Sequence, residues 1–309
     1  MSPGVTPAVS RVTVSIDPHV HSDDSYDGHE PVELILEHAA EIGLDAVVIT
    51  DHDVIGESKR AAEIADEFGL IGIPGVEVST AHGHLLAIGV ERMPPRRRPY
   101  DETVAWIHDH GGVAIVPHPF QRSRHGVRER NIPVPGAEDG EAGANGASVD
   151  AAGDGGSPVA PPIPEVDAIE VFNAWLFTGY RNRRARRFAA KYGYPGVAAS
   201  DAHHLEYVGR AFTDVEVKGR ESVDAVTADD VLDAIRNGTT RVDGRRAPIR
   251  MAAKHYVGAA GRKSGYYART GAIRSATAAR RGVAEAVSTA RVAVSQGTHR
   301  AARVLSWVT

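Results

Sequence analysis

The 309-residue sequence contains no cysteine. This absence excludes disulfides, thiolate-bound zinc and cysteine nucleophiles, so any metal ion would be held by nitrogen and oxygen ligands. Long apolar runs are missing too, since no segment approaches the roughly 18 apolar residues of a membrane-spanning helix. The opening MSPGVTPAVS also lacks the basic and apolar segments of a leader peptide. We therefore expect a cytoplasmic protein with no membrane contact.

Basic residues are scarce in most of the chain and concentrated near its end. Residues 251–309 hold ten Lys and Arg and a single acid, Glu285, whereas residues 1–250 hold 25 Lys and Arg against 39 Asp and Glu. The larger part is therefore acidic and the last part basic. We expect residues 251–309 to form a helical C-terminal extension, which either docks on the acidic body or contacts nucleic acid.

Apolar, β-branched runs alternate with helical patterns over most of residues 1–250. The expected strands cover residues 11–17, 44–51, 70–79, 84–90, 112–118, 166–173 and 196–200, and the expected helices cover 31–43, 57–69, 101–111 and 179–193. Such alternation predicts an α/β fold of parallel strands and crossover helices, either a barrel or an open sheet. Residues 121–165 interrupt the pattern with Gly, Ala, Pro and acids, which predicts a flexible insertion.

Histidines and carboxylates gather at the ends of these expected strands. The first strand runs into DPHVHSDDSYDG, where Asp17, His19 and His21 alternate and so face one side of an extended chain. The motifs ITDHD, PGVEVS, HGHLLAIG, VPHPF and ASDAHH follow at later strands. Barrel enzymes build their active sites from residues at the ends of several strands. We therefore expect these motifs to converge on one rim.

Imidazole and carboxylate ligands together suit zinc, manganese or iron. One ion needs three or four ligands, and about nine candidates are available, so the pattern indicates a centre of two to three divalent metal ions. Such a centre lowers the pKa of a bridging water and clamps the oxygens of a phosphoryl group. Each motif alone is also compatible with a cap or a turn, but burying so many ionisable groups without a metal would be costly.

Taken in order, DPHVHS, a following DG, ITDHD, PGVEVS, GHLLAIG, PHPF and SDAHH resemble the motifs of the PHP family, named for polymerase and histidinol phosphatase. The resemblance covers roughly residues 12–218. It implies a distorted seven-stranded β/α barrel with a trinuclear metal centre that hydrolyses phosphate esters. The chain is most similar to stand-alone members, which include nucleotide phosphatases and a 5′-to-3′ exonuclease acting on short RNA and DNA. The long insertion after His118 departs from the family's spacing.

The resemblance also implies which residues hold each ion. The first ion would be held by His19, His21, Glu77 and Asp201. Glu77 would bridge to a second ion, held by His84 and His118, with His82 as the rival of His84. The third ion would be held by Asp27, His52 and His203. Asp17, on the same strand face as His19 and His21, is expected to orient an imidazole.

Substrate contacts are expected from the basic stretch QRSRHGVRER, which directly follows His118. Its Arg122, Arg124, His125 and Arg128 are candidates for phosphate binding, with Arg124 and His125 favoured, because arginine offers bidentate contact to phosphate oxygens. A solvated basic loop is the alternative. Asn173 and His204 are further candidates for substrate contact. The arginine run RNRRARR is interpreted as the exposed face of a helix.

The function that these motifs favour is hydrolysis of a phosphate ester, most naturally of a nucleotide or short oligonucleotide, by a metal-bridged hydroxide. Glu77 would space the metals, Arg124 would stabilise the added charge, and His125 could protonate the leaving oxygen. A histidinol-phosphate-type phosphatase needs the same metals and stays open. A metal-dependent amidohydrolase is less favoured, because the lysine that bridges its metals has no counterpart at an expected strand end. A non-catalytic binding module would be expected to lack some of the ligands.

Overall fold

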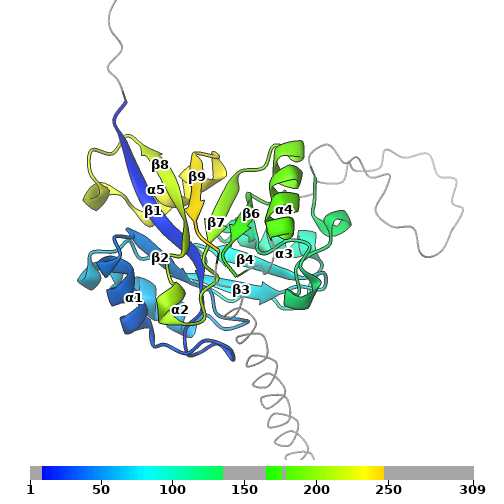
Figure 1. The fold of residues 1–309 in the computed structure, drawn as a ribbon, viewed down its shortest axis with the longest axis horizontal. Helices are drawn as coiled ribbons and strands as arrows, with labels where there is room; N and C mark the ends of the chain where they lie inside the picture. Colours follow the sequence, from blue (N-terminus) through cyan, green and yellow to red (C-terminus); the bar gives the residue numbers. More distant parts are fainter. Residues whose placement is uncertain (1–8, 135–164, 176–178, 247–309) are drawn as a thin grey trace, which may run out of the picture. The chain divides into compact units, whose positions relative to one another are not determined.

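The structure is a computed structural model, and it describes residues 9–134, 165–175 and 179–246. The strands in these ranges are β1 (Arg11–Val20), β2 (Ala46–Ile49), β3 (Gly75–Ser79), β4 (His84–Ile88), β5 (Val113–Val116), β6 (Ala168–Asn173), β7 (Gly196–Ala199), β8 (Ala211–Lys218) and β9 (Thr240–Gly244). The α-helices are α1 (Val32–Glu41), α2 (Gly56–Ile64), α3 (Tyr100–Asp109), α4 (Gly179–Tyr192) and α5 (Ala228–Arg236) (Figure 1). Among these described helices, none is long and apolar enough to cross a membrane.

The strands form two sheets, with the orders β2-β1-β8-β9 and β3-β4-β5-β6-β7. The α/β class is therefore confirmed, and each of the seven expected strands is present, but the described residues do not form a closed seven-stranded barrel. Two isolated β-bridges, Val20↔Ala202 and His52↔Glu77, link strand ends of one sheet to the other. Both bridges involve or adjoin residues of the predicted metal motifs.

The expectation of parallel strands throughout is wrong for part of each sheet. β1 pairs with β2, and β6 with β5 and β7, in parallel, whereas β4 runs antiparallel to both of its neighbours and β8 runs antiparallel to β1 and β9. The reason for β4 is the length of the connection, because Thr80–Gly83 is a hairpin turn and a parallel crossover needs a dozen residues or more.

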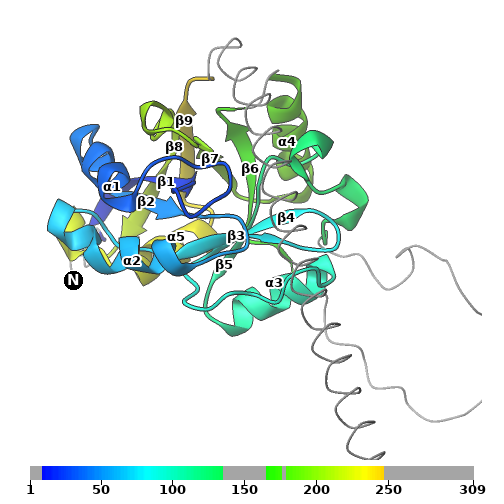
Figure 2. The same cartoon turned by 90° about the horizontal axis from the view of Figure 1, so that it is seen from below.

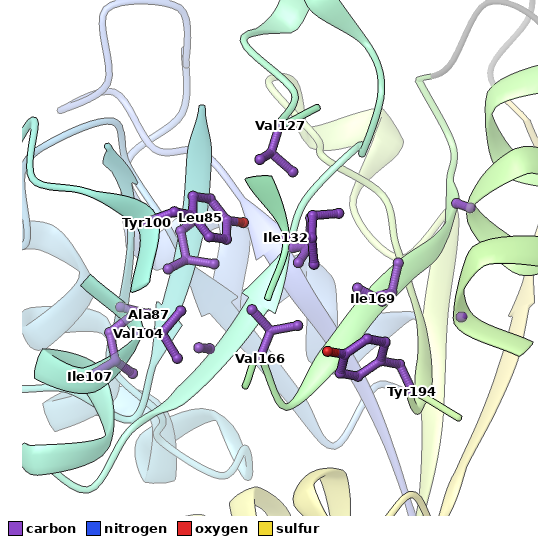
Figure 3. Packing of buried hydrophobic residues seen from close by; sticks show 14 of the residues in the cluster. Leu85, Ala87, Tyr100, Val104, Ile107, Val127, Ile132, Val166, Ile169 and Tyr194 are labelled. Carbon is purple, nitrogen blue, oxygen red and sulfur yellow. The ribbon is translucent and has the colours of Figure 1, made fainter. Parts of the chain in front are cut away.

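The helices divide between the two sheets. Figure 2 shows α1 and α2 beside β1 and β2, and α3 and α4 beside the five-stranded sheet. One hydrophobic cluster lies between that sheet and α3 and α4, and it includes Leu85 and Ala87 of β4 (Figure 3). A second cluster uses the alternate residues Leu86 and Ile88 and joins this sheet to β1, β8 and α5. The five-stranded sheet is therefore buried on both faces, which fixes where its strand ends lie.

Part of the predicted insertion is packed rather than flexible. In residues 121–134, Val127 and Ile132 are buried in the first cluster. Gly126 makes this possible, because a Cβ there would lie 2.4 Å from the carbonyl oxygen of His118. Two isolated apolar residues in a charged stretch gave too weak a pattern to predict this packing. Residues 135–164 of the insertion and the predicted extension 251–309 lie outside the described residues.

Candidate metal centre

All nine predicted metal ligands come together at the end of the sheets where the two isolated bridges lie. β1 and its loop supply His19, His21 and Asp27, the loop after β2 supplies His52, β3 and β4 supply Glu77 and His84, the loop after β5 supplies His118, and the loop after β7 supplies Asp201 and His203. At most 8% of any of these side chains is exposed. The expected convergence of these residues is therefore seen in the structure, and their binding of metal ions stays a prediction.

Four donor atoms converge in the first predicted group. His19 Nε2 lies 3.1 Å from His21 Nε2, 3.3 Å from Glu77 Oε2 and 3.6 Å from Asp201 Oδ1. His21 Nε2 lies 3.5 Å from each of the same two oxygens. Ligand atoms of a tetrahedral ion with bonds of about 2.0–2.1 Å are separated by about 3.3–3.4 Å. The spacing of these atoms is thus that of a single coordination shell.

The two carboxylate oxygens of Glu77 face different histidines. Oε2 faces His19 and His21 and also lies 3.0 Å from His52 Nδ1. Oε1 lies 2.7 Å from His84 Nδ1 and 2.9 Å from His118 Nε2. The backbone of Glu77 is fixed because its N–H donates to the Asp51 carbonyl and its carbonyl accepts from the Asp53 N–H. This geometry suits a carboxylate that spans two neighbouring cation positions.

The third predicted group adjoins the first through a shared histidine. Asp27 Oδ2 lies 3.4 Å from His52 Nε2 and 3.3 Å from His203 Nε2. The His21 ring stacks between these two imidazoles, with centroid distances of 4.6 Å to His52 and 4.3 Å to His203. Donor atoms of His21, Asp27, His52 and His203 all lie within 4.8 Å of one another.

The electrostatics leave the carboxylates ionised and two of the imidazoles neutral. Burial opposes ionisation of Glu77 and Asp201, but the surrounding imidazoles hold the pKa of Glu77, and Arg124 and His19 hold that of Asp201, well below the usual range. Burial lowers the pKa of His21 to about 3 and that of His84 to about 4. Ionised carboxylates and neutral imidazoles are the forms that bind metal ions. Against the effect of burial, the neighbouring carboxylates raise the pKa of His19 and raise that of His52 to about 9, so these two imidazoles would release a proton on binding a metal ion.

The donor set fits divalent cations. Asp27, Glu77, Glu170 and Asp201 are buried together, and the buried permanent cation beside them is Arg124, with 9% of its side chain exposed. Buried charges in such excess are expensive unless they are paired or coordinate a metal.

The residue that orients His19 is Glu170, and not Asp17 as the strand pattern predicted. Asp17 accepts backbone N–H groups of Ser200 and Gly209 at 3.0 and 2.9 Å, so it ties β1 to the loops after β7. Glu170 Oε1 lies 3.1 Å from His19 Nδ1, and Oε2 accepts from the His118 N–H. The sequence signal for Glu170 was its place inside the run VDAIEVFN, which also holds Asp167.

Asn173 hydrogen-bonds to carboxylates of the site, which argues against its predicted contact with substrate. Its Nδ2 donates to Glu170 Oε2 and to Asp201 Oδ2, both at 2.9 Å, and its Oδ1 accepts from the Trp175 N–H. The side chain is fully buried. Its donors are therefore used to hold Asp201, a partnership across 28 residues that a single motif cannot indicate.

The basic loop after β5 places its candidates differently. Arg124 forms a two-pronged ion pair with Asp201, with Nη1 to Oδ2 at 2.7 Å and Nη2 to Oδ1 at 2.9 Å. His125 is exposed, and its ring stacks on His84 with a centroid distance of 5.1 Å. Arg122 is exposed on the same turn. Arg124 and His125 thus adjoin the cluster, whereas Arg122 lies on the surface of the loop.

The remaining candidates lie around the cluster. His204 is half-buried, with its ring 4.2 Å from that of His29. His82 is exposed in the hairpin turn, so His84 and not His82 faces Glu77. Tyr26, which the motifs did not single out, stacks on His52 with a centroid distance of 4.9 Å. Its position one residue before Asp27 was the available signal.

Strained backbone gathers at this site. Positive φ angles occur here at the non-glycine residues Asp53 (58°), His118 (28°), Phe120 (68°), His125 (56°) and Asp201 (54°), and elsewhere in the described residues at Arg97 (61°). Such angles are costly for residues with a side chain and persist only where surrounding contacts impose them. Two of these residues, His118 and Asp201, are predicted metal ligands, so packing and hydrogen bonds hold these ligands in place.

Comparison with known proteins now identifies the family. Residues 17–125 match the model of the PHP domain, and residues 179–240 match the model of the PHP-associated region. The chain belongs to the PHP family. All nine predicted ligands lie within the two matched ranges.

Similar PHP proteins match over limited stretches. An uncharacterised protein of Methanocaldococcus jannaschii is 32% identical over 94 residues, which are 30% of this chain and 55% of that protein. The phosphoribosyl 1,2-cyclic phosphate 1,2-diphosphodiesterase of Eggerthella lenta is 35% identical over 85 residues, which are 26% of this chain and 32% of that enzyme. The chain thus matches about half of the first relative and about a third of the second.

Solved structures agree in fold. A two-domain protein of Bacteroides vulgatus that contains a PHP-like metal-dependent phosphoesterase superposes with a TM-score of 0.52 and 18% identity, covering 78% of this chain and 68% of that one. PsfC of Pseudomonas syringae superposes with a TM-score of 0.52 and 16% identity, covering 81% and 98% of the two chains. At these identities the likeness concerns the fold alone.

Proposed function

We propose that this PHP protein is a metal-dependent phosphoesterase that hydrolyses a phosphate ester of a nucleotide or short oligonucleotide. The observation that carries the proposal is Glu77, whose two oxygens face two different sets of buried histidines. A carboxylate in that position suits a centre with more than one cation. Two to three ions of manganese, zinc or iron are the number and types that the nitrogen and oxygen donors favour.

The residues of the site would have two roles, binding the metal ions and orienting the ligands. Divalent ions held there would act as Lewis acids toward a phosphoryl group and would activate water near neutral pH. His19, His21, Glu77 and Asp201 would hold the first ion, His84 and His118 the second with Glu77, and Asp27, His52 and His203 the third. Glu170 and Asn173 keep these ligands oriented through the bonds described above. Such outer partners are typical supports of metal ligands.

Arg124 and His125 would bind the phosphate and assist departure of the leaving group. Arg124 already lies against Asp201, and a guanidinium has five N–H donors, so a carboxylate and a phosphate can share it. His125 lies at the exposed side of His84, where an imidazole can donate a proton to a leaving oxygen. Arg122 and His204 would contact parts of the substrate further from the phosphate.

The amidohydrolase alternative finds less support in the site. The bridging position is occupied by Glu77, and the described buried residues include no lysine that could be carbamylated. A histidinol-phosphate-type phosphatase would use the same ligands, and no feature of the described residues favours it over a nucleotide substrate. The Eggerthella relative is named for a phosphodiester of a ribose phosphate, which is consistent with a nucleotide-like substrate.

The test combines metal content with a substrate panel. The purified protein is analysed for bound metals and assayed with manganese and with zinc on an aryl phosphate, a mononucleotide, a short oligonucleotide and histidinol phosphate. His84→Asn is expected to lose metal and activity, whereas His82→Asn, which changes an exposed histidine two residues away, should retain both. Less than one bound metal per chain, or no hydrolysis of any phosphate ester, would contradict the proposal.

A further inference from the structure

Helix α4 carries the strongest positive charge of any described helix. Its sequence GYRNRRARRFAAKY contains five arginines, one lysine and no acid. This composition is unusual in the acidic part of the chain, where Asp and Glu outnumber Lys and Arg. A structural role alone would not require it.

The buried face of α4 is separate from its charges. Asn182, Ala185, Phe188 and Ala189 are the buried residues of the helix, and they face the core. Tyr180, Arg183 and Arg187, at positions i, i+3 and i+7, are exposed and lie along one side. We call these three residues the α4 stripe. Tyr180 is 55% exposed, and the guanidinium of Arg181 lies 5.7 Å from its ring centroid.

The charges of the stripe are not neutralised within the described residues. Arg184 forms an ion pair with Glu129 at 2.7 Å, but in the described ranges no acid pairs with Arg183 or Arg187. Arg183 and Arg187 lie four residues apart, where like charges destabilise a helix. The stripe therefore weakens α4 slightly and supplies a surface for an anion.

The same helix is joined to the metal centre. Asn182 accepts from the Asn173 N–H at 3.3 Å and donates to the Asn173 carbonyl at 3.1 Å. Asn173 in turn donates to Asp201 of the predicted first metal group. The ion pair of Arg184 with Glu129 also ties α4 to the loop that carries Arg124 and His125. Figure 1 shows α4 beside β6, the strand that ends at Asn173.

We propose that the α4 stripe binds the sugar–phosphate backbone of a single-stranded nucleic acid whose terminal phosphate lies in the metal centre. This inference rests on the proposed function and narrows its substrate to an oligonucleotide. Arg183 and Arg187 contact successive phosphates, and Tyr180 stacks on an unpaired base. Exposed aromatic rings among basic residues are the features by which proteins bind single strands. An acidic protein surface would use the arginines but would leave Tyr180 without a role.

The first test measures binding without turnover. Fluorescence anisotropy with a 5′-phosphorylated single-stranded octamer in EDTA compares the full chain with Arg183→Gln/Arg187→Gln and with Tyr180→Ala. We expect about tenfold weaker binding in the double variant. The slope of log affinity against log salt concentration should also become shallower by about 1.4, because each phosphate contact on a single strand contributes about 0.7 to that slope. Tyr180→Ala should weaken binding about fivefold or more with little change in slope.

A matched control removes the same charge elsewhere. Arg11→Gln/Arg241→Gln changes two exposed arginines of the other sheet, with side chains 59% and 79% exposed, and should bind the octamer as the unaltered protein does. Equal weakening in this control, or full affinity in Arg183→Gln/Arg187→Gln, would overturn the proposal. So would tighter binding of a polyglutamate peptide or of anionic lipid vesicles than of the octamer.

A second measurement separates this inference from the proposed function. With metal present, kcat/KM is compared for the oligonucleotide and for a mononucleotide. In Arg183→Gln/Arg187→Gln, the ratio of kcat/KM for the oligonucleotide to kcat/KM for the mononucleotide should fall about tenfold. If the unaltered protein hydrolyses neither substrate, the proposed function fails, while the anisotropy result still decides whether the stripe binds a strand.

Discussion

Polar residues are used in two different ways in two regions of this molecule. In the metal centre, histidines and carboxylates from distant strands are buried against one another, and residues with side chains adopt left-handed backbone angles. In the segment around α5, polar groups lie at the surface and are satisfied locally. Thr227 and Asp230 form a capping box, with Asp230 Oδ2 accepting the Thr227 N–H at 2.8 Å.

The difference shows which region is built for stability. The α5 segment follows the local rules for a helix, with an N-terminal cap, acids in the first turn and Leu232 and Ile235 buried in the core. The metal centre breaks these rules, because it concentrates ionisable groups where burial opposes their charge. Proteins accept such violations mainly at functional sites. Variants in the two regions should therefore separate effects on activity from effects on folding.

The largest effect is expected at Glu77. Glu77→Ala removes the carboxylate that faces both sets of histidines, so activity should fall by about 10³-fold or more and metal content should drop by at least one ion per chain. Activity assays and elemental analysis check this expectation. Glu37→Ala, which removes an exposed glutamate of α1, is the control and should change neither value. A fully active Glu77→Ala protein would rule out the centre as described.

Replacement of Arg124 should lower the unfolding free energy of the metal-free protein more than that of the metal-loaded protein. Arg124→Met leaves the buried Asp201 carboxylate without its cationic partner, which should cost about 3 kcal/mol of unfolding free energy in EDTA. A bound divalent ion would restore a counter-charge, so the loss should shrink with metal present and the metal affinity should rise. Denaturant titrations with and without manganese measure both values. Arg122→Met, on the same turn but exposed, should show no such dependence on metal.

A variant of Glu170 tests whether this residue orients the predicted ligands His19 and His118. Glu170→Gln keeps the size of the side chain but weakens its bond to His19 Nδ1 and to the His118 N–H. Metal affinity should fall about 10- to 100-fold, as is typical when a partner of a metal-bound histidine is altered. Calorimetric titration with zinc measures the affinity. Glu67→Gln at an exposed position is the control, and an unchanged affinity in Glu170→Gln would show that His19 is oriented by other contacts.

The sequence could predict that these residues meet because their signals are local, and their role as metal ligands stays a prediction. Each motif lies within a few residues of a strand end, and strand periodicity fixes which side chains share a face. His19 and His21 could thus be placed on one face from their alternation, whereas their assignment as ligands and the choice of His84 over His82 came from the resemblance to the PHP family. The α/β class followed from the same alternation of apolar strands with helices.

The sequence could not predict contacts between residues far apart in the chain. His19 and Glu170 are 151 residues apart, and Asp17 and Ser200 are 183 apart, so nothing in DPHVHS indicates which carboxylate meets which imidazole. The prediction of a closed barrel was not confirmed for a similar reason. The division of the strands into two sheets depends on packing across both faces of β4, and this packing involves residues far apart in the chain. Strand β9, TRVDG, has little apolar pattern and forms by pairing with β8.

The smallest effect is expected in the α5 segment and should leave the metal centre untouched. Arg220 and the Thr227 N–H lower the pKa of Asp230 to about 2 from its ordinary value of 3.8. Because the folded state favours the ionised form, this stabilisation is present above pH 4 and is lost as pH falls through 2. Asp230→Asn should therefore reduce the unfolding free energy by about 1 kcal/mol at pH 7. The difference should vanish near pH 2, while metal affinity and activity at pH 7 stay the same. Urea titrations of both proteins at pH 7 and pH 2 measure the difference in unfolding free energy. A change in metal affinity would show that the two regions are coupled, and the division between stability and function would then not hold.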